Sequence, residues 1–417
     1  MDRPLLQELF SHAVAMAQPS LGVKTNLPPQ PRGRTVVIGA GKASAQMARA
    51  FEMAWDGPIT GLVVTRYGYA EACERIEIVE AAHPVPDEAG FLAARRIMEQ
   101  VSGLGPDDLV VALISGGGSS LLPAPAPGLT LADEQAINQS LLASGAPISV
   151  MNLVRNQFST IKGGRLAQQA APARVATLVV SDVPGDDPAV VASGPTIAQS
   201  GDRALARKYV ELYGLDLPVP AARILAGEDN LAPTAGDPLF DNHSVRTIAS
   251  AALSLSQAAN LARQRGIEAA ILSDSIEGEA RDVAQVHAAM AREVSLRNQP
   301  FAKPVVLLSG GETTVTLRGK GRGGRNGEFL LSLAIGLDGT SGITALAADT
   351  DGIDGSEDNA GAFVDGQSAN RMRAAGIDPL AALANNDAYS AFAAIGDLLI
   401  TGPTGTNVND FRAIIIR

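Results

Sequence analysis

The sequence predicts an α/β protein of two domains whose sheets are mostly parallel and covered by helices. The chain has 417 residues, which exceeds the size at which one hydrophobic core stops growing, so two domains are expected. Short apolar runs alternate with helical patterns along the chain. The apolar runs are aliphatic at successive positions, which is typical of strands that helices cover on both faces.

The predicted elements follow one another in a strand-then-helix order. The expected strands are 35–39, 62–65, 109–115, 175–181, 269–273, 305–309 and 344–348. Helical patterns occupy 43–54, 88–100, 253–265 and 278–296. This order favours parallel strands joined by crossover helices. Residues 226–243 collect Pro, Gly, Asp and Asn without periodicity, so they are expected to form a linker or long loop, with the domain boundary near residue 235.

Composition excludes several classes of protein. The net charge is -11 and no basic stripe accumulates, which argues against nucleic-acid binding. Cys73 is the only cysteine, so a reducing compartment is expected. No apolar run approaches the ~20 residues that span a bilayer, and the N-terminus lacks the features of a signal peptide. A cytoplasmic protein without membrane contact is expected, and self-association into a homo-oligomer stays open.

A glycine turn follows the first predicted strand. Gly39-Ala40-Gly41-Lys42-Ala43-Ser44 leads into a helix, whose first N–H groups could face an anion. Lys42 lies where a bound phosphate would need a cation, although a solvated lysine is the alternative. A dinucleotide-binding turn would look similar, but Ser44 replaces its third glycine and Arg66 stands near the expected acidic position.

A second glycine turn follows the strand 109–115. Ser115, Gly116, Gly117, Gly118, Ser119 and Ser120 are predicted to form a nest of backbone donors for the phosphates of a nucleotide. A merely tight turn is the alternative, but such a turn rarely needs three glycines. The segment 307–313 repeats this pattern in the C-terminal half. Two nests suggest that a polyphosphate is held across a cleft between the domains.

Acidic residues follow two further strands. Asp182, Asp186 and Asp187 crowd one turn, and a count of one or two carboxylates suits Mg²⁺ that is also bound by phosphate oxygens. An Asp-rich surface turn is the alternative. Asp349, Asp351 and Asp354 form a second group, whose spacing only partly resembles a calcium loop.

Two cationic segments complete the candidate site. Arg325 follows a glycine-rich loop and opens a helix, where a cation is unfavourable unless it faces an anion. Its planar fork suits the charge of a transferring phosphoryl group. Asn152 and Arg155 could bind a small carboxylate, whereas Lys162 could equally lie on a solvated face. The histidines, His83 among them, show no metal-ligand spacing.

The motifs together resemble the class II glycerate 2-kinases, which carry a C-terminal MOFRL domain. The resemblance rests on GAGKAS, LISGGGSSL, NLVRNQFSTIKGGRLA, SDVPGDDPAVVASGPT, LSGGETTVTLRGKGRGGRN, ADTDGIDG and TGPTGTNVND. These motifs cover nearly the whole chain, in order. One departure is Gly327, where the family usually has glutamine.

The resemblance implies a Rossmann-like domain over residues 1–235, a C-terminal α/β domain of MOFRL type over 236–417, and an active site in the cleft between them. It implies phosphorylation of D-glycerate at the 2-hydroxyl, with ATP as co-substrate and Mg²⁺ as cofactor. The residues that match the family's functional positions are Lys42, Arg325, Asp182, Asp187 and Asp351. Asp182 and Asp187 are expected as catalytic residues and metal ligands, and which aspartate holds the metal and which takes the proton stays open. Asp351 is expected to bind substrate, together with Asn152 and Arg155 of the polar cluster described above.

Family members are often labelled hydroxypyruvate reductases, so an NAD(P)H-dependent reductase is the alternative prediction. Hydride transfer of this type needs a complete dinucleotide turn and a histidine–acid pair, and the sequence shows neither. Arg66 could still bind an NADP phosphate. A third possibility, a sugar-acid binding protein without catalysis, explains the nests but not the clustered carboxylates.

Overall fold

The computed structural model describes residues 2–227 and 231–417, which form two compact units. One unit contains residues 19–181 and 187–248, and we call it the first-sheet unit. The other contains the N-terminal segment to Gln18, residues 182–186 and residues 249–417, and we call it the C-terminal unit. The α/β class and the presence of two units confirm the prediction from sequence.

The first-sheet unit is built on a six-stranded sheet in the order β3-β2-β1-β4-β5-β6. Its strands are β1 (Thr35–Ala40), β2 (Thr60–Arg66), β3 (Ile76–Ala81), β4 (Leu109–Ser115), β5 (Arg174–Val180) and β6 (Ser244–Ala249). Strands β1 to β5 pair in parallel. Every residue of β1 and β4 is buried, as expected for central strands with helices on both faces.

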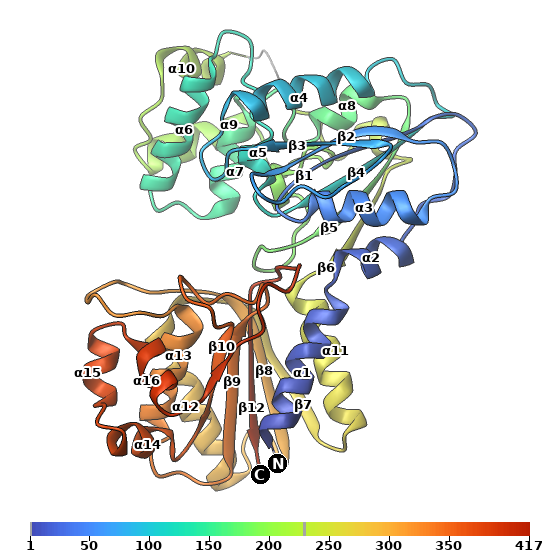
Figure 1. Ribbon diagram of the computed structural model, residues 1–417. Coiled ribbons are helices and arrows are strands. Elements are labelled where there is room, and N and C mark those ends of the chain that lie inside the picture. Colours follow the sequence, from blue (N-terminus) through green and yellow to red (C-terminus); the bar gives the residue numbers. More distant parts are fainter. Residues whose placement is uncertain (1, 228–230) are drawn as a thin grey trace. The chain divides into compact units, whose positions relative to one another are not determined.

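Helices cover both faces of this sheet, with α3 and α4 on opposite sides (Figure 1). The helices of the unit are α2 (Pro19–Thr25), α3 (Ser44–Ala54), α4 (Glu88–Val101), α5 (Gly118–Leu121), α6 (Leu131–Ala143), α7 (Ile148–Asn156), α8 (Arg165–Ala170), α9 (Arg203–Leu212) and α10 (Val219–Ala226). Helices α6, α7, α9 and α10 pack around a small apolar core of their own, which includes Leu141, Val154 and Phe158.

The C-terminal unit has a mixed sheet in the order β11-β10-β9-β12-β8-β7. Its strands are β7 (Glu268–Glu279), β8 (Val305–Thr314), β9 (Ile343–Asp349), β10 (Gly361–Asp365), β11 (Leu398–Leu399) and β12 (Asp410–Ile416). Only β7 and β8 pair in parallel, because β12 enters antiparallel between β8 and β9. The prediction of mostly parallel sheets is therefore correct for the first sheet and wrong for the second.

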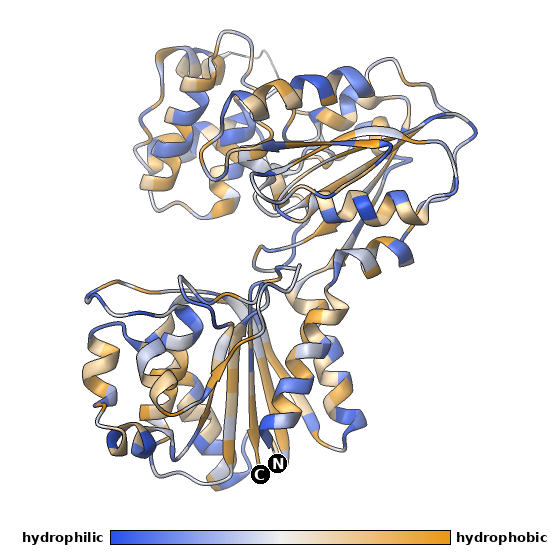
Figure 2. Cartoon of the chain, viewed as in Figure 1, coloured by the Kyte–Doolittle hydropathy of each residue, from blue (hydrophilic) through white to orange (hydrophobic). Residues whose placement is uncertain are grey.

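Helices also cover both faces of the second sheet, with α1 (Asp2–Met16) and α11 (Ala251–Gln264) on one side (Figure 1). The opposite side carries α12 (Ala280–Arg297), α13 (Arg325–Gly336), α14 (Ser368–Ala374), α15 (Pro379–Ala384) and α16 (Ala388–Ala394). The apolar residues gather on the strands and on the helix faces that cover them (Figure 2).

The bounds of the units differ from the predicted bounds 1–235 and 236–417 in three places, one of which is the segment 182–186 in the C-terminal unit. Helix α1 belongs to the C-terminal unit, because its buried face (Leu6, Leu9, Phe10 and Ala13) joins the core on β9 and β12. Strand β6 extends the first sheet, so the boundary falls between Ile248 and Ala249. Residues 228–230 of the predicted linker lie outside the described residues.

Within the described ranges, no helix combines the length and the apolar character that a bilayer crossing requires.

Candidate functional site

The two predicted glycine turns lie side by side at one edge of the first sheet. Strands β1 and β4 are parallel neighbours, so their carboxyl ends meet. The strand order 3-2-1-4-5-6 reverses direction between these two strands. In open α/β sheets, ligands bind outside the carboxyl ends of the strands at such a switch point. The fold therefore places both turns where a ligand is expected.

The first turn is held against the second by a contact that only glycine permits. Gly41 has a φ of 141°, and a Cβ at this position would lie 2.1 Å from Ser115 Oγ. The Lys42 amide donates to the Gly116 carbonyl at 2.8 Å, and the Ala43 amide donates to Ser115 Oγ at 3.0 Å. The amides of Lys42 and Ala43, which lie just before α3, are thus engaged within the protein. The buried Ser115 hydroxyl supports the turn.

The second turn keeps backbone donors available. Among residues 2–227 and 231–417, no acceptor is found for the amides of Gly117 and Gly118. Gly117 is in the left-handed region with a φ of 79°, and Gly118 packs so closely that a Cβ would lie 2.8 Å from the Ala40 carbonyl oxygen. Successive free amides in such a turn form an anion-binding nest. This geometry agrees with the predicted phosphate-binding role of the segment 115–120.

Cationic side chains surround the nest. A Cβ on Gly117 would lie 3.3 Å from Lys42 Cε and 2.8 Å from His83 Nε2. Arg66, at the end of β2, stacks on the Tyr69 ring with 3.6 Å between its Cζ and the ring centroid. In the described part of the chain, neither Lys42 nor Arg66 forms an ion pair with a carboxylate. The edge of the sheet therefore carries positive charge that an anionic ligand could neutralise.

The pKa of His83 depends in part on this positive charge. Burial, followed by the charges of Lys42 and Arg66, lowers the pKa of the His83 imidazole to about 4. The ring is therefore neutral at pH 7. Because protonation is disfavoured in the folded state, this group costs stability as the pH falls from the unfolded pKa of about 6.5 toward 4.

The predicted substrate-binding residues of this unit contact the second turn through Ser193. Ser119 Oγ lies 2.7 Å from Ser193 Oγ, which lies 3.0 Å from Asn152 Oδ1. The Arg155 guanidinium donates to the same Asn152 oxygen at 2.6 Å. The loop predicted for the nucleotide and the cluster predicted for the substrate are thus parts of one polar network.

The acidic turn after β5 is divided between the units. Asp182 belongs to the C-terminal unit, where its carbonyl accepts a hydrogen bond from Asn409 Nδ2 at 2.7 Å. Asp187 is exposed and belongs to the first-sheet unit, and its Oδ1 accepts from the Ala189 amide. No group of three or more His, Cys, Asp or Glu side chains within the described ranges is arranged to hold a metal ion.

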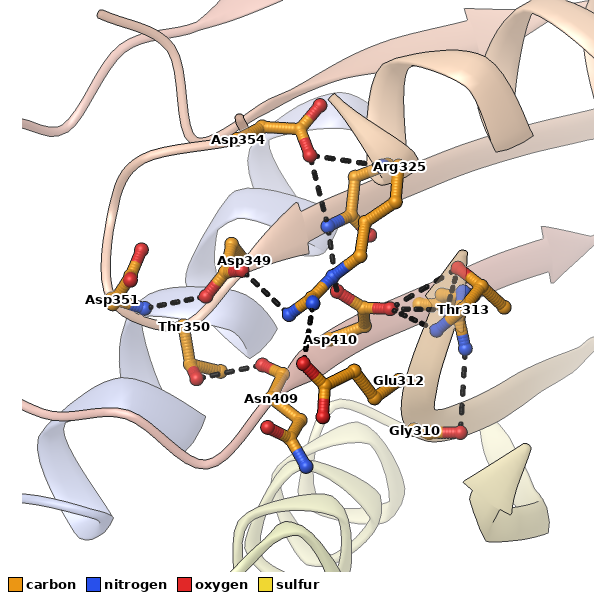
Figure 3. A network of polar contacts seen from close by, with 12 residues as sticks. Gly310, Glu312, Thr313, Arg325, Asp349, Thr350, Asp351, Asp354, Asn409 and Asp410 are labelled. Atoms are coloured by element: carbon orange, nitrogen blue, oxygen red, sulfur yellow. Dashed lines mark hydrogen bonds and ion pairs between the residues drawn. The ribbon is translucent and has the colours of Figure 1, made fainter. Parts of the chain in front are cut away.

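In the C-terminal unit, Arg325 is fixed by three carboxylates, one for each guanidinium nitrogen (Figure 3). Its Nε donates to Asp410 at 2.7 Å, one terminal nitrogen donates to Glu312 at 2.7 Å, and the other donates to Asp349 at 2.8 Å. Burial opposes the charge, but these three carboxylates raise the pKa of Arg325 above its usual value. The side chain remains 22% exposed, so a ligand can reach it.

The carboxylates around Arg325 are themselves held in place. Asp410 Oδ2 contacts the fully buried Arg412 at 2.5 Å and accepts from Thr313. Asp354 accepts hydrogen bonds from the amides of Asn326 and Gly327, at the start of α13. Burial raises the pKa of Asp354 to about 6. Asp354 therefore fixes the first turn of the helix that carries Arg325.

Glycine brings the loop after β9 against the loop before α13. A Cβ on Gly324 would lie 2.4 Å from the backbone carbon of Asp354, and one on Gly355 would lie 2.8 Å from Gly324 Cα. Asp351, predicted to bind substrate, accepts a hydrogen bond from the Ile353 amide and donates its own amide to Asp349. In this structure Asp351 orders the loop, and its predicted role toward substrate stays a prediction.

A pocket of about 240 Å³ opens beside Arg325. Its lining joins the glycine loop to the ends of β8 and β9, through Thr313, Val315, Leu317, Gly321, Gly323, Gly324, Arg325, Glu328, Asp349, Gly355 and Asn386. Burial and the nearby Asp351 raise the pKa of Asp349 well above its usual range, while Arg325 lowers it. The pocket thus presents one fixed cation with Asp349 beside it.

Sequence reasoning missed three residues of these networks. Glu312 and Asp410 stand inside motifs that were recognised, but neither was assigned to Arg325. Asp410 is 85 positions away from Arg325 in the sequence, and nothing local indicates their contact. Ser193 gave no signal in the sequence beyond the unusual Ser193-Gly194-Pro195 segment.

Two family models match the chain. A domain of unknown function, DUF4147, matches residues 5–226, and the MOFRL family matches residues 305–410. A protein of Agrobacterium vitis that bears the name hydroxypyruvate reductase is 55% identical over 99% of this chain and 94% of its own length. A D-glycerate 2-kinase of Thermotoga maritima is 40% identical over 98% of this chain and 97% of its own length.

The solved structures give the same picture for the whole chain. The crystal structure of a glycerate kinase from Thermotoga maritima matches with a TM-score of 0.92 and 40% identity, and the match covers 99% of each chain. A protein of Pyrococcus horikoshii of solved structure matches with a TM-score of 0.86 and 35% identity over 99% of this chain.

The first prediction concerns the charge at the switch point. In an NMR titration, we expect His83 to titrate near pH 4, because burial and the charges of Lys42 and Arg66 disfavour its protonated form. Lys42→Met should move this midpoint upward. His287, which lies in the other unit and whose pKa is also lowered to about 4, should not move. A wild-type His83 midpoint near 6.5, or a midpoint unaffected by Lys42→Met, would contradict the described geometry.

Proposed function

This chain belongs to the family of proteins with DUF4147 and MOFRL regions that includes the glycerate kinases, and we propose that it transfers the terminal phosphoryl group of ATP to the 2-hydroxyl of D-glycerate. The products are 2-phosphoglycerate and ADP. The observation that carries this proposal is the switch-point nest of Gly117 and Gly118, which lies beside Lys42, a cation without an ion pair in the described residues. Such a site favours a polyphosphate.

The nucleotide is assigned to the segment Ser115–Ser120. The free amides of Gly117 and Gly118 donate to phosphate oxygens, and the Lys42 ammonium neutralises their charge. Phosphoryl transfer depends mainly on positioning and on the stabilisation of charge. A rigid turn therefore supplies much of what the reaction needs.

Arg325 is assigned to the transferring phosphoryl group. Its three carboxylate contacts use one N–H on each nitrogen. Each terminal nitrogen keeps a second N–H, for which no acceptor is found in the described residues. These two N–H groups lie in the plane of the guanidinium group, and such planar donors suit phosphate oxygens. The carboxylates hold the fork in orientation, so little ordering is left to occur during the reaction.

Mg²⁺ is the proposed cofactor, with Asp182 and Asp187 as its protein ligands. Mg²⁺ typically takes one or two carboxylates and fills its remaining positions with water and phosphate oxygens. A pair of aspartates on one turn fits this pattern, and a cage of three or more protein ligands is not needed. When bound, the ion would neutralise phosphate charge.

Small-molecule substrates are thus the partners that the proposal requires. We also propose a cytoplasmic location, which the single cysteine favours, and no role in binding nucleic acid, since the net charge is -11.

Hydroxypyruvate reduction is the second candidate, favoured by the name of the Agrobacterium relative. A dinucleotide would place its pyrophosphate on the first amides of α3. In the turn just before α3, the amides of Lys42 and Ala43 donate to Gly116 and Ser115, and the first amide of α3, that of Ser44, donates to the Gly41 carbonyl. His83 lies near the cations Lys42 and Arg66. The structure thus favours the kinase.

The second prediction tests the reaction itself. Purified protein with D-glycerate, ATP and Mg²⁺ should form 2-phosphoglycerate, which phosphorus NMR distinguishes from the 3-phosphate. Removal of divalent cations with EDTA should abolish turnover, and excess Mg²⁺ should restore it. If the protein oxidised NADPH with hydroxypyruvate and formed no phosphoglycerate, the kinase proposal would fail.

The third prediction concerns Arg325. Lysine keeps the charge but cannot meet three carboxylates and still donate twice to a phosphoryl group. We expect Arg325→Lys to lower kcat by about 10³, at the lower end of what a phosphoryl-binding arginine contributes, with little change in the KM for ATP. Arg322→Lys is the control, since Arg322 is exposed, stacks on Tyr389 and, within the described residues, forms one ion pair, with Glu357 at 3.6 Å. Equal losses in both variants would show that the loop, rather than the Arg325 fork, matters.

A further inference from the structure

A chain of hydrogen bonds with a fixed direction runs behind the second glycine turn. Asn152 Nδ2 donates to the Val190 carbonyl at 2.9 Å, so Asn152 Oδ1 must face the opposite way. There it accepts from Arg155 at 2.6 Å and from the Ser193 hydroxyl at 3.0 Å. The orientation of one buried amide thus sets the direction of the whole chain.

This direction determines what Ser119 can do. A serine hydroxyl has one hydrogen and two acceptor lone pairs. Ser193 uses its hydrogen on Asn152, so the 2.7 Å contact between the two serine oxygens requires Ser119 to donate. Ser119 Oγ then has no hydrogen left for a ligand. It can accept a hydrogen bond from a hydroxyl group, but it cannot donate one to a phosphate.

The same network contains an uncompensated cation. Lys162 is fully buried and contacts Glu134 at 2.5 Å, which corrects the expectation that it could lie on a solvated face. Arg155 lies close enough to feel both charges, and desolvation lowers the pKa of its guanidinium. These two cations share one carboxylate, and Arg155 makes no ion pair of its own within residues 2–227 and 231–417. A charge withdrawn from water in this way is expected to have an anionic partner.

Arg155 is accessible to such an anion, because it remains partly exposed while Asn152 and Ser193 are buried. Its Nε donates to Asn138 at 2.7 Å and one terminal nitrogen donates to Asn152. These neutral partners orient the guanidinium without cancelling its charge. The arginine is therefore ordered in advance for a carboxylate.

Backbone strain marks the segment that carries Ser193. Ala192, Ser193 and Gly194 follow one another in the left-handed region, with φ values of 52°, 60° and 55°. Non-glycine residues hold this conformation only where their surroundings enforce it, often at functional sites. A Cβ on Gly118 would lie 2.6 Å from Ala192 Cβ. The strained segment thus packs against the nest, where the Ser193 hydroxyl contacts Ser119.

We propose that Arg155 and Ser119 form a subsite for the 2-hydroxy acid, in which Arg155 binds the carboxylate and Ser119 accepts a hydrogen bond from a hydroxyl of the same molecule. Asn152 and Ser193 are positioning residues that act through these two. This inference rests on the proposed function. It moves Ser119 from the predicted nucleotide-binding set to the acceptor substrate, and leaves Gly117 and Gly118 to the phosphates.

Calorimetric titration of D-glycerate without ATP tests this subsite separately from catalysis. Arg155→Met should weaken glycerate binding by about 100-fold, since it removes a charge-assisted pair from a partly desolvated site. ATP binding should stay within about threefold of the wild type. The control is Arg223→Met, on the exposed face of α10, which should leave both ligands unaffected. Unchanged glycerate affinity in Arg155→Met would overturn the proposal.

Ser193→Gly tests the positioning role and relieves rather than adds backbone strain, so it should fold. We expect the KM for glycerate to rise about tenfold, the loss of one oriented hydrogen bond, while the KM for ATP is unchanged. Ser119→Ala should do the same. A rise in the KM for ATP alone would return Ser119 to the nucleotide and overturn the assignment. If the wild type binds glycerate but makes no phosphoglycerate, the proposed reaction fails while the subsite stands.

Discussion

The close contact between Gly41 and Ser115 is the constraint on which the candidate site depends. Strands β1 and β4 end side by side, and each must turn away without colliding with the other. A side chain at position 41 would overlap Ser115, so the turns can interlock only with glycine there. In this contact the amides of Lys42 and Ala43 donate to the second turn. The amides of Gly117 and Gly118 have no acceptor in the described residues, and Lys42 lies against Gly117.

The two units differ in how their cationic side chains are paired with carboxylates. The first-sheet unit contains Lys42, Arg66 and Arg155, none of which forms an ion pair in the described residues. The C-terminal unit surrounds Arg325 with Asp349, Asp410 and Glu312. Unpaired cations attract an anionic ligand, whereas a cation among carboxylates is held in one orientation at the expense of net attraction. One unit is suited to binding, and the other to the precise placement of a single donor group.

The sequence predicted what is local. Strands β1 and β4, buried on both faces, were recognised with their ends, as were the glycine turns and Arg325. Contacts between distant segments were not predictable. The insertion of β12 between β8 and β9 makes the second sheet mixed and brings Asp410 to Arg325. The periodicity of the sequence predicts neither the strand order nor this contact. The motif of Ser115 predicts a phosphate ligand, which stays a prediction. Only the position of Gly41 shows that its hydroxyl is engaged.

We propose that the amides of Gly117 and Gly118, which the interlocked turns leave without an acceptor in the described residues, bind the triphosphate. A crystal structure with a non-hydrolysable ATP analogue and D-glycerate measures this most directly. We expect phosphate oxygens within about 3 Å of these two amide nitrogens, with the Lys42 ammonium on the same phosphates. A triphosphate bound elsewhere, with the Gly117 and Gly118 amides left to solvent, would contradict it.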